Sequence, residues 1–405
     1  MRTTGLCWAA VVFCLAVPAC ADGPVVGLYS HSDENLFPSA LISTALVDWN
    51  GDDQVAQDKA DTTAAEDDPD PLYGDENGWI GITLEDVPEE ANIEVEIAID
   101  GYLKTSKWTG QLKPGQTKVR ILPKAAWDYD KLHLVKEETP VVFTASVTVN
   151  DEALPPFTET LLLKSLNDCL FYVLLKDEPE TAEDIDDLSW LFAAYVNENH
   201  PWIDGVLKDA KETGIVDSFT GYQSGDPAEV MKQVLAVWAA LQGRNITYSD
   251  VSTTTPNKGT VSQSVRFLDE SIEATQANCV DGSVLMASIL RKIGLDVELV
   301  MVPGHCFLAF KADKKGELRI GLETTMLGTT DAEVPEDLPD FFADLSVEGY
   351  EAEHAAFVGA VLTGLANLDK HKEAFEANSN PNIQLISIEE ARDLGIRPIA
   401  SKRKK

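Results

Sequence analysis

The stretch NCVDGSVLMASILRKIGLDVELVMVPGHCFLAF, residues 278–310, decides the fold of the C-terminal half of the chain. Asn278 is a favourable N-cap and Gly294 suits the position just past a helix end, so the sequence predicts a helix between them. Two apolar runs of strand length follow at 297–302 and 305–310, separated by a Pro-Gly turn. A buried helix followed by successive strands indicates an α+β fold.

A third apolar run, 318–323, follows the polar turn ADKKGE and predicts a hairpin with 305–310. A hairpin centred on Lys314 places Glu323 directly opposite His305. Directly opposed residues have Cβ atoms roughly 4.5–5.5 Å apart, close enough for a carboxylate to accept the imidazole N–H. A register error of one residue would move Glu323 to the other face of the sheet.

Cys279 falls in the first turn of the predicted helix, where unpaired N–H groups and the positive end of the dipole favour a thiolate. Together with His305 and Glu323 it supplies the nucleophile, base and orienting group of a cysteine hydrolase or acyltransferase. Each residue alone has an ordinary structural interpretation: a core thiol, a satisfied histidine and an ion-pair partner. The order and spacing of the three favour the catalytic interpretation.

A metal site is the alternative for the adjacent His305 and Cys306. Such a site would need Cys279 to converge with both, whereas neighbours on a strand point to opposite faces. We therefore expect Cys306 to be a small buried side chain, and Cys169 to lie in the core as well. No C-x-x-C pair is present. The sequence predicts neither a metal nor an organic cofactor.

Three blocks resemble the successive sequence blocks of the transglutaminase-like superfamily: NCVDGSVLMASILRKIGL (278–295), VPGHCFLAF (302–310) and LETTMLG (322–328). The resemblance covers roughly 230–328. Within the superfamily, the chain resembles in particular the secreted bacterial members that have an N-terminal sandwich. It implies a papain-like catalytic domain, a helix packed on an antiparallel sheet, with Cys279 as nucleophile, His305 as base and Glu323 as third member. The family usually has aspartate in the third place, so Glu323 departs from its pattern.

An acyl-transfer site also needs donors for the developing oxyanion. The backbone N–H of Cys279 is one natural donor. Gln263, in SQSVRF, is the favoured side-chain donor, with Gln276 and Tyr248 as alternatives. Arg266 is expected to pair with an acidic neighbour.

The N-terminal half has a different period. Apolar and polar residues alternate in 92–99 and 141–149, with turn signals between such runs, which predicts an immunoglobulin-like β-sandwich over 79–177. Before it, 22–78 is an N-terminal segment that includes an acidic linker.

The remaining chain divides into the catalytic domain, 178–334, and a mainly helical C-terminal extension, 335–405. Helical patterns occur at 182–200 and 226–244, ahead of the catalytic blocks. A further helix is expected in SIEEARDLG, where Ser387 is the N-cap.

Residues 1–21 are predicted to be a signal peptide, with an apolar run at 6–17 before an A-x-A-like cleavage site. The alternative is a lipid anchor on Cys20, which Pro18 disfavours. We expect an exported protein, periplasmic or extracellular, with no membrane span. The formal net charge of −36 argues against nucleic acids and anionic membranes as partners.

The sequence thus predicts an exported enzyme that transfers acyl groups from protein or peptide amides through a Cys-His-Glu triad and an acyl-thioester. Resolution by water would make it a peptidase or amidase, and resolution by an amine a transglutaminase. The alternative is a non-catalytic protein-binding module on the same scaffold. A metal-dependent hydrolase is a third hypothesis, which loss of activity to a chelator would reveal.

Overall fold

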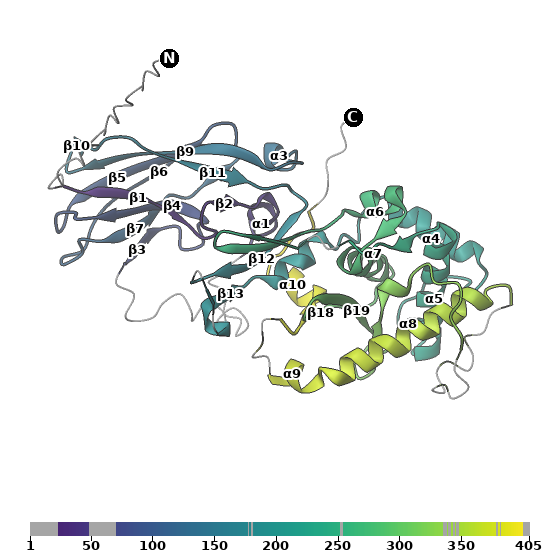
Figure 1. Ribbon diagram of the computed structural model, residues 1–405. Helices are drawn as coiled ribbons and strands as arrows, with labels where there is room; N and C mark the ends of the chain where they lie inside the picture. Colours follow the sequence, from purple (N-terminus) through teal and green to yellow (C-terminus); the bar gives the residue numbers. More distant parts are fainter. Residues whose placement is uncertain are drawn as a thin grey trace, which may run out of the picture.

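The computed structural model describes residues 23–47 and 70–399, with short gaps at 177, 180, 252–253, 335–337, 339–341, 343–344, 346–347, 378–379 and 381. The predicted signal peptide, Cys20 and most of the acidic linker lie outside the described residues. The chain forms an α+β protein in which two packed sheets lie at one end and a mixed helix and sheet region at the other (Figure 1).

Two antiparallel-rich sheets build the N-terminal region. In spatial order the first contains β1 (Val25–Ser30), β4 (Ile80–Glu85), β7 (Val119–Leu122) and β3 (Leu72–Gly74). The second contains β2 (Asn35–Leu36), β11 (Phe157–Leu163), β9 (Thr139–Val149), β5 (Asn92–Ile99), β6 (Leu103–Gln111) and β8 (Ala126–Trp127), with β10 (Glu152–Ala153) paired to β9. Both sheets contribute to one apolar core, because the alternate apolar residues of β4, β5 and β9 point inwards. The two strands predicted from alternation are confirmed.

Residues before the acidic segment 51–78, residues after it, and 72–74 within it all belong to these sheets, so the end of the expected linker is a strand. β1 pairs with β4, and β3 pairs with β7. β2 and the short helix α1 (Pro38–Ser43) also precede the linker, and β2 pairs with β11. The region built by the two sheets therefore begins well before residue 79, which the sequence had placed at its start. Local patterns do not show that a strand before a long insertion pairs with one after it.

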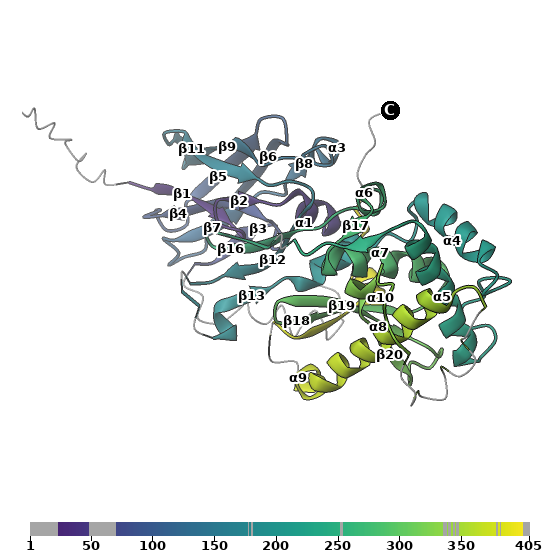
Figure 2. The same cartoon turned by 45° about the vertical axis from the view of Figure 1, so that its right-hand side comes forward.

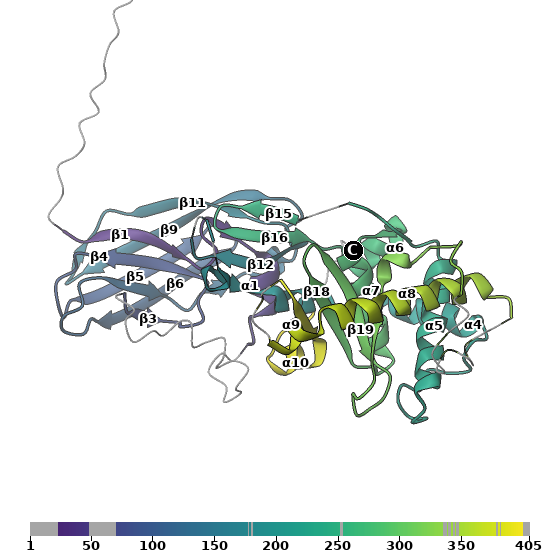
Figure 3. The ribbon, with the colours of Figure 1, turned by 60° about the horizontal axis from the view of Figure 1, so that its bottom comes forward.

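A third sheet joins the two ends of the molecule (Figure 3). Its strands, in order, are β13 (Ile185–Asp187), β12 (Asp168–Leu174), β16 (Thr260–Ser264) and β15 (Thr254–Asn257). β12 was expected within the sandwich and β16 within the catalytic domain, yet the two pair antiparallel. The expected boundary at 177 therefore cuts through a sheet.

The helix predicted over 182–200 is wrong. The segment forms the 3-10 turn η1 (Ala182–Asp184), the strand β13 and the 3-10 helix η2 (Ser189–Tyr195). The Asp187 carboxylate accepts a hydrogen bond from the Ser189 N–H at 2.9 Å and closes a tight turn there. Every residue from 191 to 196 is at most 2% exposed, so this run is buried all round rather than on one helical face.

The strands of the C-terminal sheet agree closely with those predicted from the sequence. Its order is β20 (Arg319–Leu322), β19 (His305–Lys311), β18 (Val297–Val302) and β21 (Gln384–Ser387), all antiparallel. The three strands expected at 297–302, 305–310 and 318–323 are confirmed. β21 comes from the segment expected to be a helical extension, so that segment completes the sheet rather than following it.

The helix α7 (Cys279–Lys292) packs on one face of this sheet, and Cys306, Leu308 and Phe310 join the core beneath it. Phe307 and Ala309 point to the opposite face, where side chains from later helices cover them. The other helices in the described residues are α3 (Tyr129–Leu132), α4 (Trp202–Glu212), α5 (Pro227–Gly243), α6 (Leu268–Ala274), α8 (Glu351–Lys370), α9 (Lys372–Ala377) and α10 (Ile388–Asp393). Figure 2 shows α8 running beside β20. None of the helices in the described part of the chain is long and apolar enough to cross a membrane.

Candidate active site

Cys279 is the first residue of α7, as the sequence predicts. The Asn278 side chain caps the helix by accepting the Asp281 N–H at 2.9 Å, and the Asp281 carboxylate accepts the Asn278 N–H at 3.3 Å. This reciprocal pair fixes the backbone on both sides of Cys279. The partly exposed thiol therefore lies at the positive end of a rigid, mostly buried helix.

Asp281 links the helix start to the preceding segment. Its carboxylate accepts the Arg266 N–H at 2.8 Å and lies 3.6 Å from the Arg266 guanidinium. The expectation that Arg266 pairs with an acidic neighbour is confirmed. Burial raises the pKa of Asp281, and the hydrogen bond from the Arg266 backbone counteracts part of that rise.

His305 is the first residue of β19, and its Nε2 lies 2.7 Å from Oε2 of Glu323. The expected contact therefore forms, although the predicted register is wrong by two residues. Leu308 pairs with Leu322 and Ala309 with Gly321, so His305 and Glu323 are diagonal rather than opposed. An even shift keeps both side chains on the same face, which is why the contact survives the error.

Glu323 is held from several directions. It is 4% exposed and is the N-cap of the 3-10 turn η3 (Thr324–Met326). Oε1 accepts the Thr325 N–H at 3.2 Å and its hydroxyl at 2.8 Å, while Oε2 faces His305. Burial is the largest single influence and would raise the pKa of Glu323, but the hydrogen bond with His305, the charge of His305 and the two hydrogen bonds from Thr325 together outweigh it, so the pKa is lowered. The residue is thus an ionised, fixed partner for the imidazole.

The pKa of His305 is raised from 6.5 to about 10. Its hydrogen bond with the Cys279 side chain is the largest cause, and its hydrogen bond with Glu323 is the next. Because Nε2 is engaged by Glu323, Nδ1 is the ring nitrogen left for the thiol. The imidazole therefore joins the thiol to the carboxylate, and its raised pKa makes it cationic at neutral pH.

The three candidate catalytic residues thus converge, from α7, β19 and the end of β20. Comparisons with protein-family models, curated proteins and solved structures find no match. The chemistry of the site is therefore inferred from its own geometry and from the sequence blocks that form it.

The other two described cysteines are structural. Cys306 is 1% exposed and joins the core on the face opposite to Phe307, and Cys169 is fully buried. Both expectations are confirmed. Burial raises the pKa of each thiol well above its usual value. In the described ranges of the chain, no group of three or more His, Cys, Asp or Glu side chains could hold a metal ion.

Gln263, the favoured oxyanion donor, is engaged within the third sheet. It lies on β16 opposite Cys169 and Thr254, and its amide oxygen accepts the Thr254 hydroxyl at 3.3 Å. The sheet that joins the two ends of the molecule holds β16 there, a placement that distance along the chain does not reveal. The first alternative, Gln276, is exposed, and its carbonyl accepts a hydrogen bond from Arg266.

Tyr248, the second alternative, is placed beside the nucleophile. Its strand β14 (Thr247–Tyr248) pairs in parallel with β17 (Gln276–Ala277), which leads directly into Cys279. The pKa of Tyr248 is raised, first by burial and then by the charges at Cys279, Asp250 and Glu323. The phenol is therefore electrostatically coupled to both ends of the triad.

Two hydroxyls that the sequence did not single out tie the carboxylate turn to the nucleophile helix. The Ser283 hydroxyl donates to the Cys279 carbonyl at 2.7 Å and lies 3.1 Å from the Thr324 hydroxyl. Gly282 allows this approach, because a Cβ there would lie 3.2 Å from Oγ1 of Thr324. The small residues after Cys279 and the Thr-Thr pair after Glu323 were the sequence features that could have indicated this contact.

The helix α8 also positions Glu323 and was not predicted individually. Its Ala360 carbonyl accepts the Glu323 N–H at 3.0 Å. Gly364 and Gly321 bring the helix and β20 into backbone contact: a Cβ on Gly364 would lie 2.3 Å from the carbonyl carbon of Gly321. Glu323 is thus held in place in part by the contact of Gly321 with Gly364, two residues more than forty positions apart in sequence.

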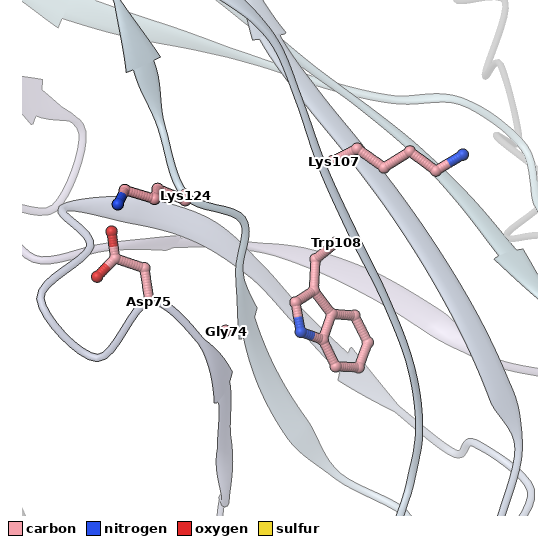
Figure 4. A pocket seen from close by; sticks show the side chains of 5 residues that line it. All are labelled: Gly74, Asp75, Lys107, Trp108 and Lys124. Carbon is pink, nitrogen blue, oxygen red and sulfur yellow. The ribbon is translucent and has the colours of Figure 1, made fainter.

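A shallow depression of about 450 Å³ lies on the sandwich, away from these residues. It is lined by Gly74, Asp75, Lys107, Trp108 and Lys124 (Figure 4). Lys107 points away from Lys124 and is paired with the Glu94 and Glu96 carboxylates. The indole of Trp108 packs edge-on against Tyr73 and borders the core, which is a structural role.

Proposed function

We propose that this protein is a transglutaminase-like cysteine enzyme that transfers acyl groups from amide bonds of proteins or peptides. The hydrogen-bonded chain from Cys279 through His305 to Glu323 carries the proposal. The three sequence blocks that resemble the superfamily add support, because these same residues come from them.

In the proposed reaction the Cys279 thiolate attacks the carbonyl carbon of the amide, and the carbonyl π electrons move onto oxygen. The tetrahedral intermediate collapses as the His305 imidazolium gives its proton to the leaving nitrogen. An acyl-thioester and a free amine result. Water or a second amine then attacks the thioester, neutral His305 takes its proton, and the Cys279 thiolate leaves as the starting pair is restored.

Glu323 supports this cycle without touching the substrate. Its carboxylate fixes the ring orientation and stabilises the imidazolium through Nε2, which leaves Nδ1 to serve the sulfur. Each step uses protein groups, so the proposed reaction requires neither a metal nor an organic cofactor.

The proposal also includes the setting of the enzyme. The apolar leader and its small-residue cleavage site support export to the periplasm or beyond. The two N-terminal sheets would form an immunoglobulin-like recognition module joined to the catalytic region.

Capture of an acyl-enzyme tests the proposal. The protein is treated with p-nitrophenyl acetate, and peptide mass spectrometry locates the acetyl group. We expect acetylation of Cys279 in the wild type and in Cys306→Ala, and none at position 279 in Cys279→Ala. His305→Ala should acylate at least tenfold more slowly. Wild-type protein that forms no thioester would support the non-catalytic binding module instead.

Alkylation gives an independent test of the thiol and imidazole pair. At pH 6, iodoacetamide should modify Cys279 much faster in the wild type than in His305→Ala, because the His305 side chain beside the thiol assists attack by the sulfur. Cys169 and Cys306 serve as internal controls, since both are buried. Equal rates at Cys279 in the two proteins would contradict the catalytic interpretation.

A further inference from the structure

Tyr248 lies between the two ends of the triad. On one side of β14, the Thr247 N–H bonds the Thr275 carbonyl at 3.1 Å and the Ser249 N–H bonds the Ala277 carbonyl at 2.9 Å. β14 also contacts η3, the turn that begins after Glu323. The backbone of Tyr248 is therefore fixed both to the strand before the nucleophile and to the turn after the carboxylate.

The fit of β14 against the carboxylate turn is close. Gly328 follows η3, and a Cβ at that position would lie 2.8 Å from Cγ2 of Thr247 and 3.1 Å from the Ile246 carbonyl oxygen. Gly328 has φ +89°, which a residue with a side chain rarely adopts. The position of Tyr248 is thus set by rigid backbone packing rather than by a free loop.

The phenol of Tyr248 combines a fixed backbone with access to solvent. The residue is 40% exposed, and its raised pKa keeps the hydroxyl protonated at neutral pH. Its hydrogen-bond partner is the exposed carboxylate of Asp250. Because water can solvate that carboxylate in place of the phenol, the hydroxyl can turn to another acceptor at small cost.

A second donor is present at the nucleophile. The Asn278 side chain takes the N–H of Asp281, and among the described residues no group accepts the N–H of Cys279. This N–H lies at the positive end of α7, where a negatively charged oxygen is stabilised.

We propose that Tyr248 is a catalytic residue whose hydroxyl, together with the Cys279 N–H, binds the oxyanion during acyl transfer. The inference rests on the proposed function and assigns one further residue to it. As the sulfur–carbon bond forms, the carbonyl π electrons move to oxygen, and both donors hydrogen-bond that oxygen without transferring a proton. When the carbonyl reforms and the leaving group departs, the hydroxyl returns to Asp250.

Two reactions of the same thiol test the assignment in Tyr248→Phe. Acylation by p-nitrophenyl acetate passes through an oxyanion, whereas alkylation by iodoacetamide is a direct displacement without one. We expect the acylation rate of Cys279 to fall by roughly 10²-fold, as for loss of one oxyanion donor. The alkylation rate should stay within about twofold of the wild type. The matched control is Tyr129→Phe, a phenol of similar exposure, 38%, on the N-terminal region.

Each outcome is decisive. Equal acylation rates in Tyr248→Phe and wild type would overturn the assignment of Tyr248 and leave the proposed function standing. An equal fall in both reactions would also overturn it, because it would indicate a disturbed thiol rather than a lost donor. Wild-type protein that is alkylated but never acylated would instead remove the proposed function itself, and the inference with it.

Discussion

Nε2 of His305 and Oε2 of Glu323 lie 2.7 Å apart although the two residues are diagonal in the β19 and β20 pairing. The extra methylene of glutamate, compared with the aspartate usual in the resembled family, gives the carboxylate additional reach across this diagonal. The position just past the end of β20 also lets η3 hold the second carboxylate oxygen. Side-chain length and strand register are therefore matched at this position.

This match predicts that Glu323→Asp impairs the site, although the charge is kept. Shortening the side chain by one carbon withdraws the carboxylate by about 1.5 Å from the ring. We expect acylation of Cys279 to slow by roughly tenfold to a hundredfold, as for a misplaced catalytic group. Rates measured with p-nitrophenyl acetate check this. Unchanged rates would show that the diagonal contact does not orient His305.

Removing the charge at Glu323 should shift the pH dependence of the site. Glu323→Gln is expected to lower the pKa of His305, because the hydrogen bond that the ring donates to the carboxylate is the second largest cause of its elevation. The alkaline limb of Cys279 acylation should then move to lower pH. The matched control is Glu298→Gln, which neutralises a buried glutamate of the same sheet that pairs with Arg319. That variant should lower stability and leave the pH profile in place.

Cys279→Ala should change how stability depends on pH. The folded pKa of His305 is raised from 6.5 to about 10, so its stabilising contribution is complete below pH 6.5 and is lost as the pH rises towards 10. The hydrogen bond with Cys279 is the largest cause, so in Cys279→Ala the loss should finish at lower pH. Urea unfolding from pH 6 to 10 and the NMR titration of His305 check this. An unchanged His305 titration would contradict the contact.

The contact between α8 and β20 predicts an asymmetry between two glycines of one helix. Gly364→Ala places a Cβ 2.3 Å from the Gly321 backbone, which cannot move aside easily. We expect a loss of about 1–3 kcal/mol in unfolding free energy and slower acylation, because Glu323 is bonded to the same helix. In Gly359→Ala the Cβ meets only the flexible end of Met326, at 2.9 Å. That variant should keep wild-type stability and rate, and equal losses in both would contradict the prediction.

The cap of α7 should matter for both stability and reactivity. Asn278→Ala removes the acceptor for the Asp281 N–H and should cost about 1 kcal/mol in thermal or urea unfolding. It should also slow alkylation of Cys279, because the helix start that positions the thiol is loosened. Ser387→Ala removes the comparable cap of α10, which accepts the Glu390 N–H. Its expected result is a similar loss of stability with unchanged alkylation of Cys279.

Local rules succeeded wherever a feature depends on neighbours in sequence. Asn278 and Gly294 mark the ends of α7 because capping is decided within a few residues. The strands around His305 were predictable from short apolar runs bounded by turns. The 182–200 helix failed because its apolar residues are buried all round, so their spacing carried no information about one face.

The sequence predicted only in part which distant segments of the chain lie next to one another. Gln263 and Tyr248 both precede Cys279 in sequence, and spacing alone does not show which elements they pair with. Pairing of β16 with β12 takes Gln263 to another sheet, whereas pairing of β14 with β17 brings Tyr248 to the nucleophile. The contact of Gly321 with Gly364 could not be predicted from the sequence, because a glycine allows a close backbone approach but does not indicate which segment makes it.

The sequence by itself determined the helix that begins at Cys279, the strand that begins at His305 and the order of the three candidate groups, because caps, turns and periodicity act over a few residues. Only the tertiary structure decided the strand register, the diagonal contact of His305 with Glu323, the support from α8 and the place of Tyr248. These features depend on which distant segments pack together. That packing is determined by the burial of whole apolar faces of helices and sheets, which no single segment specifies.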